Sequence, residues 1–200
     1  MTLTVLSVMF TAIISQNIVL SQYQGICPFL GVSKKMSSAA GMGLAVIFVM
    51  AISSVFCWLV YEYILTPLEL EYLSTMAFIL VIASLVQLLE MALRRFSPTL
   101  YSALGVYLPL ITTNCAILGT ANSTIVFSSY ESFGMVFAAS VATGMGFLLA
   151  ICLLAGVRLK TDKADIPKCF KGFPITLVTA AIMAMAFAGF SGMLAGWTYG

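Results

Sequence analysis

Residues 39–65, "AAGMGLAVIFVMAISSVFCWLVYEYIL", carry one charged side chain, Glu62, in an otherwise apolar run. A helix needs roughly 20 predominantly apolar residues to cross the hydrocarbon core of a bilayer, so this stretch is long enough to span it. The whole chain has the same character, because 62% of its 200 residues are hydrophobic, 8% are charged and none is histidine. Ordinary soluble domains have about a quarter of their residues charged. The sequence therefore predicts an all-α integral membrane protein.

Six apolar stretches of this kind follow one another and leave almost no residues for a soluble domain. They are residues 3–22, 39–65, 73–93, 98–121, 133–157 and 172–197. The first has neither a basic region ahead of it nor a small-residue cleavage site, so we expect a retained helix and not a signal peptide. The sequence predicts six transmembrane helices in one multi-pass membrane domain.

The basic residues all fall in alternate loops between these stretches. They are Lys34, Lys35, Arg94, Arg95, Arg158, Lys160, Lys163, Lys168 and Lys171. The intervening loops carry acidic residues and no lysine or arginine. Because basic loops stay in the cytoplasm, this distribution predicts that both termini lie outside it. A missed or invented crossing would scatter the charges over both faces, so the pattern also supports the count of six.

Two short motifs recur in the same order along the chain. "CPFLG" at Cys27 and "CAILG" at Cys115 share Cys-x-x-Leu-Gly, and "AAGMG" and "ATGMG" precede the apolar runs of the second and fifth stretches. The order predicts two three-helix repeats, residues 1–97 and 98–200. An odd number of helices places the second repeat in the membrane upside down, as in many transporters. The second copy needs about 15 extra residues, which we expect in a loop over residues 120–131. Chance similarity is the alternative.

The first and fourth stretches are expected to be broken near the middle of the membrane. Polar residues from Ser15 to Gln24 and then Gly25 interrupt the first, and Pro109 and the run Thr112 to Asn114 interrupt the fourth. Backbone freed by such breaks cannot face lipid and must line protein or a cavity. Breaking both helices could bring the two motif cysteines together. A proline kink with Ser and Thr bonding to the helix is the alternative.

The five cysteines differ in their expected roles. Cys57 and Cys152 lie in apolar helices and are interpreted as small hydrophobic side chains, while Cys169 lies in a cytoplasmic loop where thiols stay reduced. Cys27 and Cys115 are related by the repeat and are candidate ligands for a soft metal or an iron–sulfur cluster, which wants four thiolates. Two cysteines are half of such a set, so a second, similar subunit is expected to complete it. A disulfide is the competing chemistry.

Five segments resemble the RnfA (also called RsxA) subunits of Rnf complexes, and NqrE of the sodium-pumping NADH:quinone oxidoreductase is the next relative. They are "CPFLGVSKK" (27–35), "FILVIASLVQLLEM" (78–91), "LPLITTNCAILG" (108–119), "ADIP" (164–167) and "FAGFSGM" (187–193). The resemblance implies a prokaryotic inner-membrane subunit of a ferredoxin:NAD⁺ oxidoreductase that exports Na⁺ or H⁺. It also implies a homologous RnfE partner in opposite orientation, together sharing a [2Fe–2S] cluster to which Cys27 and Cys115 give two ligands.

Other partners implied by the resemblance are subunits of the RnfB, RnfC, RnfD and RnfG types and the lipid bilayer, with no nucleic acid. No Ser/Thr-Gly-Ala-Thr flavin-attachment motif occurs, so we expect no flavin on this chain. No catalytic residue and no complete active site are predicted within it. Two alternatives remain: an NqrE-type subunit, and a small inverted-repeat transporter or channel with incidental cysteines.

Three further features leave two interpretations each. Glu90 and Arg94 have helical spacing and suit either an ion pair at the membrane edge or a role in the ion path. Asn114 could donate a hydrogen bond toward a cluster sulfur or satisfy carbonyls of the broken helix. The basic segment of residues 158–171 fits orientation signalling, or docking of an acidic cytoplasmic partner.

Overall fold

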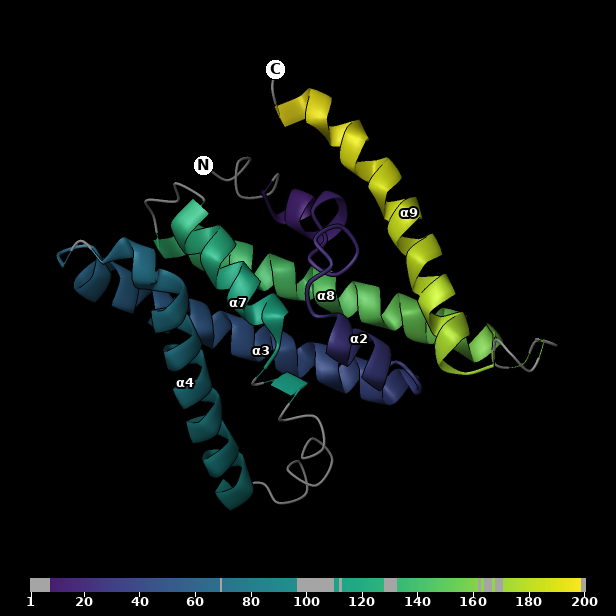
Figure 1. Ribbon diagram of the computed structural model, residues 1–200, viewed down its shortest axis with the longest axis horizontal. Helices are drawn as coiled ribbons and strands as arrows, with labels where there is room; N and C mark the ends of the chain where they lie inside the picture. The colour runs from purple at the N-terminus through teal and green to yellow at the C-terminus, as the bar shows by residue number, and fades with distance from the viewer. Residues whose placement is uncertain are drawn as a thin grey trace.

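Every regular element in the described part of the chain is a helix, which confirms the all-α class. The computed structural model describes residues 8–68, 70–96, 110–111, 113–127, 133–161, 163, 167 and 171–198. In chain order the elements are η1 (Thr11–Ser15), α2 (Ile26–Val32), α3 (Met36–Val60), η2 (Tyr61–Leu65), η3 (Glu71–Leu73), α4 (Ser74–Phe96), α7 (Cys115–Ala121), η4 (Asn122–Phe127), α8 (Phe133–Thr161) and α9 (Phe173–Thr198) (Figure 1).

Four described helices are long and apolar enough to cross a membrane. They are α3 with its continuation η2 (Met36–Leu65), the Ser74–Met91 part of α4, α8 (Phe133–Thr161) and the Phe173–Phe190 part of α9. They match the second, third, fifth and sixth predicted crossings. The described parts of the first and fourth crossings are not long continuous helices, because each is divided near its cysteine.

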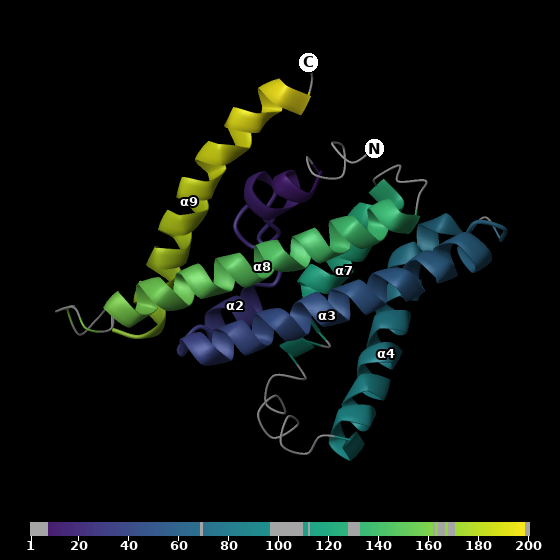
Figure 2. The same cartoon turned by 180° about the vertical axis from the view of Figure 1, so that it is seen from behind.

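Helices α3 and α8 lie side by side and run in opposite directions through the middle of the molecule (Figures 1 and 2). Glycine allows the close approach at both halves of the pair. A Cβ added to Gly43 would overlap the Leu148 side chain, and one added to Gly144 would lie 3.0 Å from Cγ1 of Ile47. The repeated Gly-Met-Gly motif therefore serves helix packing, as small residues commonly do between membrane helices.

The two neighbouring glycines of α3 give a matched test of this packing. Gly43→Ala is expected to lower the thermal stability of the purified protein, since overpacking a close contact costs about 1–3 kcal/mol. Gly41→Ala adds a methyl group that meets no described atom within 4 Å, and a helical Gly→Ala change is otherwise neutral or stabilising. Heat-induced aggregation in detergent measures both. Equal stability of the two variants would contradict tight packing at Gly43.

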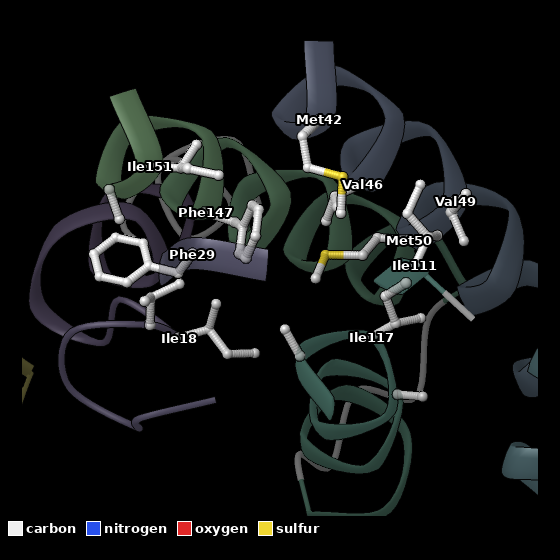
Figure 3. Close-up of a cluster of buried hydrophobic side chains, with 14 of the residues drawn as sticks. Ile18, Phe29, Met42, Val46, Val49, Met50, Ile111, Ile117, Phe147 and Ile151 are labelled. Atoms are coloured by element: carbon white, nitrogen blue, oxygen red, sulfur yellow. The ribbon is translucent and has the colours of Figure 1, made fainter. Parts of the chain in front are cut away.

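The two broken segments pack against this helix pair and share one core. Figure 3 shows that core, with side chains from both broken segments pointing toward those of α3 and α8. Ile18 and Phe29 come from the first segment and Ile117 from α7, and all three are at most 2% exposed. The remaining labelled members are Met42, Val46, Val49, Met50, Ile111, Phe147 and Ile151.

A buried asparagine replaces regular hydrogen bonding between η1 and α2. The Asn17 side chain is fully buried, and its amide nitrogen donates to the carbonyls of Ile13 (3.0 Å) and Gly146 (2.8 Å). Its carbonyl oxygen accepts from the backbone N–H groups of Val19 (3.1 Å) and Leu20 (3.3 Å). Asn17 thus organises the irregular chain and joins it to α8.

The loop expected over residues 120–131 is wrong for residues 120–127, which continue α7 and form η4. The polar side chains there bond to the helix itself. The hydroxyl groups of Thr120 and Thr124 donate to the carbonyls of Ala116 and Thr120, each at 2.7 Å. This back-bonding lets threonines continue inside a buried helix. Residues 128–132, the rest of the expected loop, lie outside the described residues.

Candidate functional site

Both motif cysteines lie in the first turn of a short helix that begins directly after a break. Cys27 is the second residue of α2, whose N-cap Gly25 has the left-handed φ of 76°. Cys115 is the first residue of α7, whose N-cap Asn114 accepts the N–H of Ala116 at 3.1 Å through its side-chain oxygen. The predicted breaks at the two cysteines are therefore present in the structure. Pro109 and Thr112, two of the predicted breaking residues, lie outside the described residues.

A hydrogen bond joins the two breaks. The backbone N–H of Gly25 donates to Sγ of Cys115, and the nitrogen and sulfur are 2.9 Å apart. The bonded residues are separated by 90 positions in the chain, yet Cys27 follows Gly25 by only two. The fold thus brings the two Cys-x-x-Leu-Gly motifs together at one place.

Gly25 is required at this junction by its backbone and by its neighbours. A side chain would be strained at φ 76°, and its Cβ would lie 2.9 Å from Cβ of Ala116 and 3.2 Å from Oδ1 of Asn114. We expect Gly25→Ala to cost at least about 2 kcal/mol, from the left-handed conformation and the overlap together. Thermal unfolding of the purified protein measures the loss.

The control for Gly25→Ala is Gly189→Ala in α9, where an added methyl group meets no described atom within 4 Å. Gly189→Ala should leave the unfolding temperature unchanged. An unfolding temperature for Gly25→Ala that equals that of the control would show that the junction tolerates a side chain, contrary to the close approach of the two breaks.

The Cys27 and Cys115 thiols are both exposed on the surface of this chain. Cys57 is buried in α3 and Cys152 is half-buried in α8, away from the junction. Cys169 lies outside the described residues. Within the described part of the chain, no group of three or more histidine, cysteine, aspartate or glutamate side chains could hold a metal ion. The junction therefore presents two thiols outward, where a second protein can reach them.

Two buried amide groups beside the junction have unused hydrogen-bonding capacity. Among the described atoms, Nδ2 of Asn114 and Oε1 of Gln24 have no partner. Asn114 uses its oxygen to cap α7, and the expectation that it satisfies carbonyls of the broken helix is not what the described contacts show. Its amide nitrogen is a free donor next to Cys115. Gln24 lies over Gly119 so closely that a Cβ there would overlap its amide group.

Arg158 is a buried positioning residue, although the sequence places it in a basic loop. The loop prediction is wrong because α8 extends to Thr161 and carries Arg158 inside the fold, where it is 8% exposed. One guanidinium nitrogen donates to the Leu30 carbonyl at 3.1 Å and to the Ser33 hydroxyl at 2.9 Å. Arg158 thereby holds the C-terminal end of α2, the helix that carries Cys27.

A sequence signal for the burial of Arg158 exists. Residues 151, 154, 155 and 158 follow helical spacing, and the first three are fully buried, so residue 158 continues their face. The other expected charge interaction, between Glu90 and Arg94, stays a prediction because the Arg94 side chain lies outside the described residues.

Comparison with known proteins places the chain in a family. Residues 5–194 match the family model described as "Rnf-Nqr subunit, membrane protein". The chain is 53% identical over 97% of its length to the full RnfA-type subunit of the Na⁺-translocating ferredoxin:NAD⁺ oxidoreductase complex of Acetobacterium woodii. It is 47% identical, over 96% of this chain and 98% of the relative, to the corresponding subunit of an ion-translocating oxidoreductase complex of Syntrophotalea carbinolica.

A protein of the same description from Cronobacter sakazakii is 50% identical, over 91% of this chain and 93% of its own length. These matches span nearly the whole chain. The resemblance expected from the cysteine motifs is confirmed, and the chain belongs to the Rnf-Nqr family of membrane subunits.

Proposed function

We propose that this chain is the RnfA-type subunit of an ion-translocating ferredoxin:NAD⁺ oxidoreductase and carries electrons within the membrane. Its relatives bear the names of such subunits over nearly their full length. The observation that carries the proposal is the 2.9 Å hydrogen bond from the Gly25 N–H to Sγ of Cys115, which places the two motif cysteines at one junction. At this junction Cys27 and Cys115 would give two thiolates to a [2Fe–2S] cluster shared with a homologous subunit.

The residues at the junction fit half of such a cluster site. Iron–sulfur clusters are held by cysteine thiolates, normally four, and two exposed thiols are present here. The surrounding backbone from Gln16 to Gly25 is not regular helix, and irregular backbone is not found facing lipid. A protein partner must therefore cover this face, and a homologous subunit in opposite orientation would supply the remaining two cysteines.

The residues of this chain hold and tune the two ligands. When bound, the cluster would take up and release one electron at a time. The Gly25 N–H stabilises negative charge on the Cys115 sulfur, and such hydrogen bonds to sulfur help set a reduction potential. The free Asn114 amide donor can act on the same site, while Arg158 fixes the end of α2. The hydrocarbon core is about 30 Å thick, so electrons need a carrier near its middle.

We further propose that residues 1–97 and 98–200 are inverted repeats and that the chain crosses the membrane six times. Each motif cysteine begins a helix of seven residues, and each short helix is followed by a long one in an antiparallel pair. Helices α4 and α9 then leave opposite ends of that pair toward opposite sides (Figure 1).

A reporter fused after Gly200 tests this orientation. Because all nine basic residues belong to alternate loops, the reporter should behave as external to the cytoplasm. A reporter that is active only in the cytoplasm would overturn the proposed topology, and with it the opposite orientation of the two repeats.

Electron paramagnetic resonance of the reduced, anaerobically purified complex tests the proposed cluster. The double variant Cys27→Ser, Cys115→Ser should lack one [2Fe–2S] signal and about two iron atoms per complex, as expected for loss of one such cluster. The matched control is Cys57→Ala, Cys152→Ala, which changes two cysteines of this chain away from the junction.

The control should retain every signal and the full iron content of the parent complex. Unchanged signals and iron in the Cys27→Ser, Cys115→Ser complex would overturn the electron-carrier proposal. Such a result would leave the family membership intact and favour a transporter without a cluster.

A further inference from the structure

An apolar groove lies where the first turn of α3 meets the last turns of α8, at the end of the helix pair that also holds α2 (Figure 2). Its volume is about 580 Å³, within the range of small-molecule sites. The lining residues are Met36 of α3 and Leu149, Cys152, Leu153, Gly156, Val157 and Lys160 of α8.

The groove follows one outward face of α8. Its lining positions on that helix recur at spacings of three and four, which places them on one side. Leu153 is 44% exposed and Val157 is 40% exposed, so the apolar wall is open to its surroundings. Arg158 belongs to the opposite side of the helix, where it is buried against α2. The groove is thus separate from the cysteine junction.

Positive charge gathers at the end of the groove. Lys160 lines it and is exposed, and Lys35 is exposed directly before Met36, at the N-cap of α3. The carboxylates whose side chains are described lie on other parts of the fold, Glu62 in η2 beyond the far end of α3 and Glu90 on α4. An anion at this end would therefore meet two lysines.

We propose that this groove binds an anionic phospholipid. An acyl chain would lie along the apolar wall, and the phosphate would contact Lys160 and Lys35. Basic residues at the edge of the membrane attract anionic headgroups by about 1 kcal/mol each. An apolar helix of a partner protein would instead bury the Lys160 ammonium without a counter-charge, which is costly in a membrane.

The test uses the whole complex in nanodiscs made with equal amounts of phosphatidylglycerol and phosphatidylcholine. Native mass spectrometry counts the lipids of each class that stay bound. The parent complex should retain phosphatidylglycerol in preference to phosphatidylcholine. Lys160→Gln should lower that preference about fivefold, the equivalent of about 1 kcal/mol. Lys163→Gln, which removes an exposed charge just beyond the groove, should change it less than about twofold.

A second variant tests the apolar wall. A Cβ on Gly156 would lie 3.7 Å from Cε of Met36, an ordinary contact, so Gly156→Leu fits the fold and fills the groove. It should lower retention of both lipids, whereas Gly189→Leu on α9 should not. Three results would overturn the proposal: no preference for phosphatidylglycerol in the parent complex, equal effects of Lys160→Gln and Lys163→Gln, or release of a protein subunit from Gly156→Leu without loss of lipid.

Discussion

Replacing either Cys27 or Cys115 by serine is expected to lower ferredoxin-dependent NAD⁺ reduction by the assembled complex at least about a hundredfold. A serine hydroxyl does not replace a thiolate in an iron–sulfur site, and the hydrocarbon core of about 30 Å is too thick for a single electron-transfer step. Both single variants should show the loss, because each thiolate is a quarter of the same ligand set. Steady-state assays of purified complexes, normalised to the amount of this chain, give the comparison.

The matched control for these variants is Cys57→Ala. Cys57 is fully buried in α3 and serves as a small apolar side chain there. Its replacement by alanine should leave the rate within about twofold of the parent, because no ligand is lost. A complex with serine at position 27 or 115 that reduces NAD⁺ as fast as the Cys57→Ala complex would remove the electron-carrier role from the junction.

Asn17→Ala is expected to destabilise the chain more than any other single change to a polar side chain of the first segment. The N–H groups of Val19 and Leu20 lose their acceptor, and the link to the Gly146 carbonyl is lost as well. A buried donor left without a partner costs about 1–3 kcal/mol, so the total should reach about 3 kcal/mol or more. The yield of assembled complex and its unfolding temperature should both fall.

Gln22→Ala provides the comparison for Asn17→Ala, because Gln22 lies in the same irregular stretch with an exposed side chain. It should unfold within about 0.5 kcal/mol of the parent, as is usual for surface substitutions. Equal unfolding temperatures for the two variants would mean that the Asn17 hydrogen bonds do not organise the break.

Composition and local interruptions are enough to predict much of this fold. The apolar runs predict the four long helices, because length and hydrophobicity alone decide whether a helix can span a bilayer. The polar residues and Gly25 mark the first break, and Asn114 marks the second, since both favour helix N-termini over helix interiors. Local chemistry therefore locates both cysteines at the starts of helices.

The sequence does not predict features that depend on distant contacts. The hydrogen bond between Gly25 and Cys115 joins residues 90 positions apart, and no local pattern encodes such a pairing. The charge of Arg158 favours a loop and outweighs the helical spacing that continues a buried face. Residues 120–127 are predicted as a loop because threonine and asparagine favour turns, whereas here their side chains bond to helical neighbours or to α4.

The most direct test of the account is whether the Cys27 and Cys115 thiols can be bridged. Complex-containing membranes would be stripped of iron after Cys57, Cys152 and Cys169 of this chain are replaced by alanine, and then treated with a short bifunctional thiol reagent. Because the Gly25 N–H contacts the Cys115 sulfur, mass spectrometry should find the peptides that contain residues 27 and 115 linked to each other. Labelling of both thiols by a monofunctional reagent, with no linked peptide, would contradict a shared site.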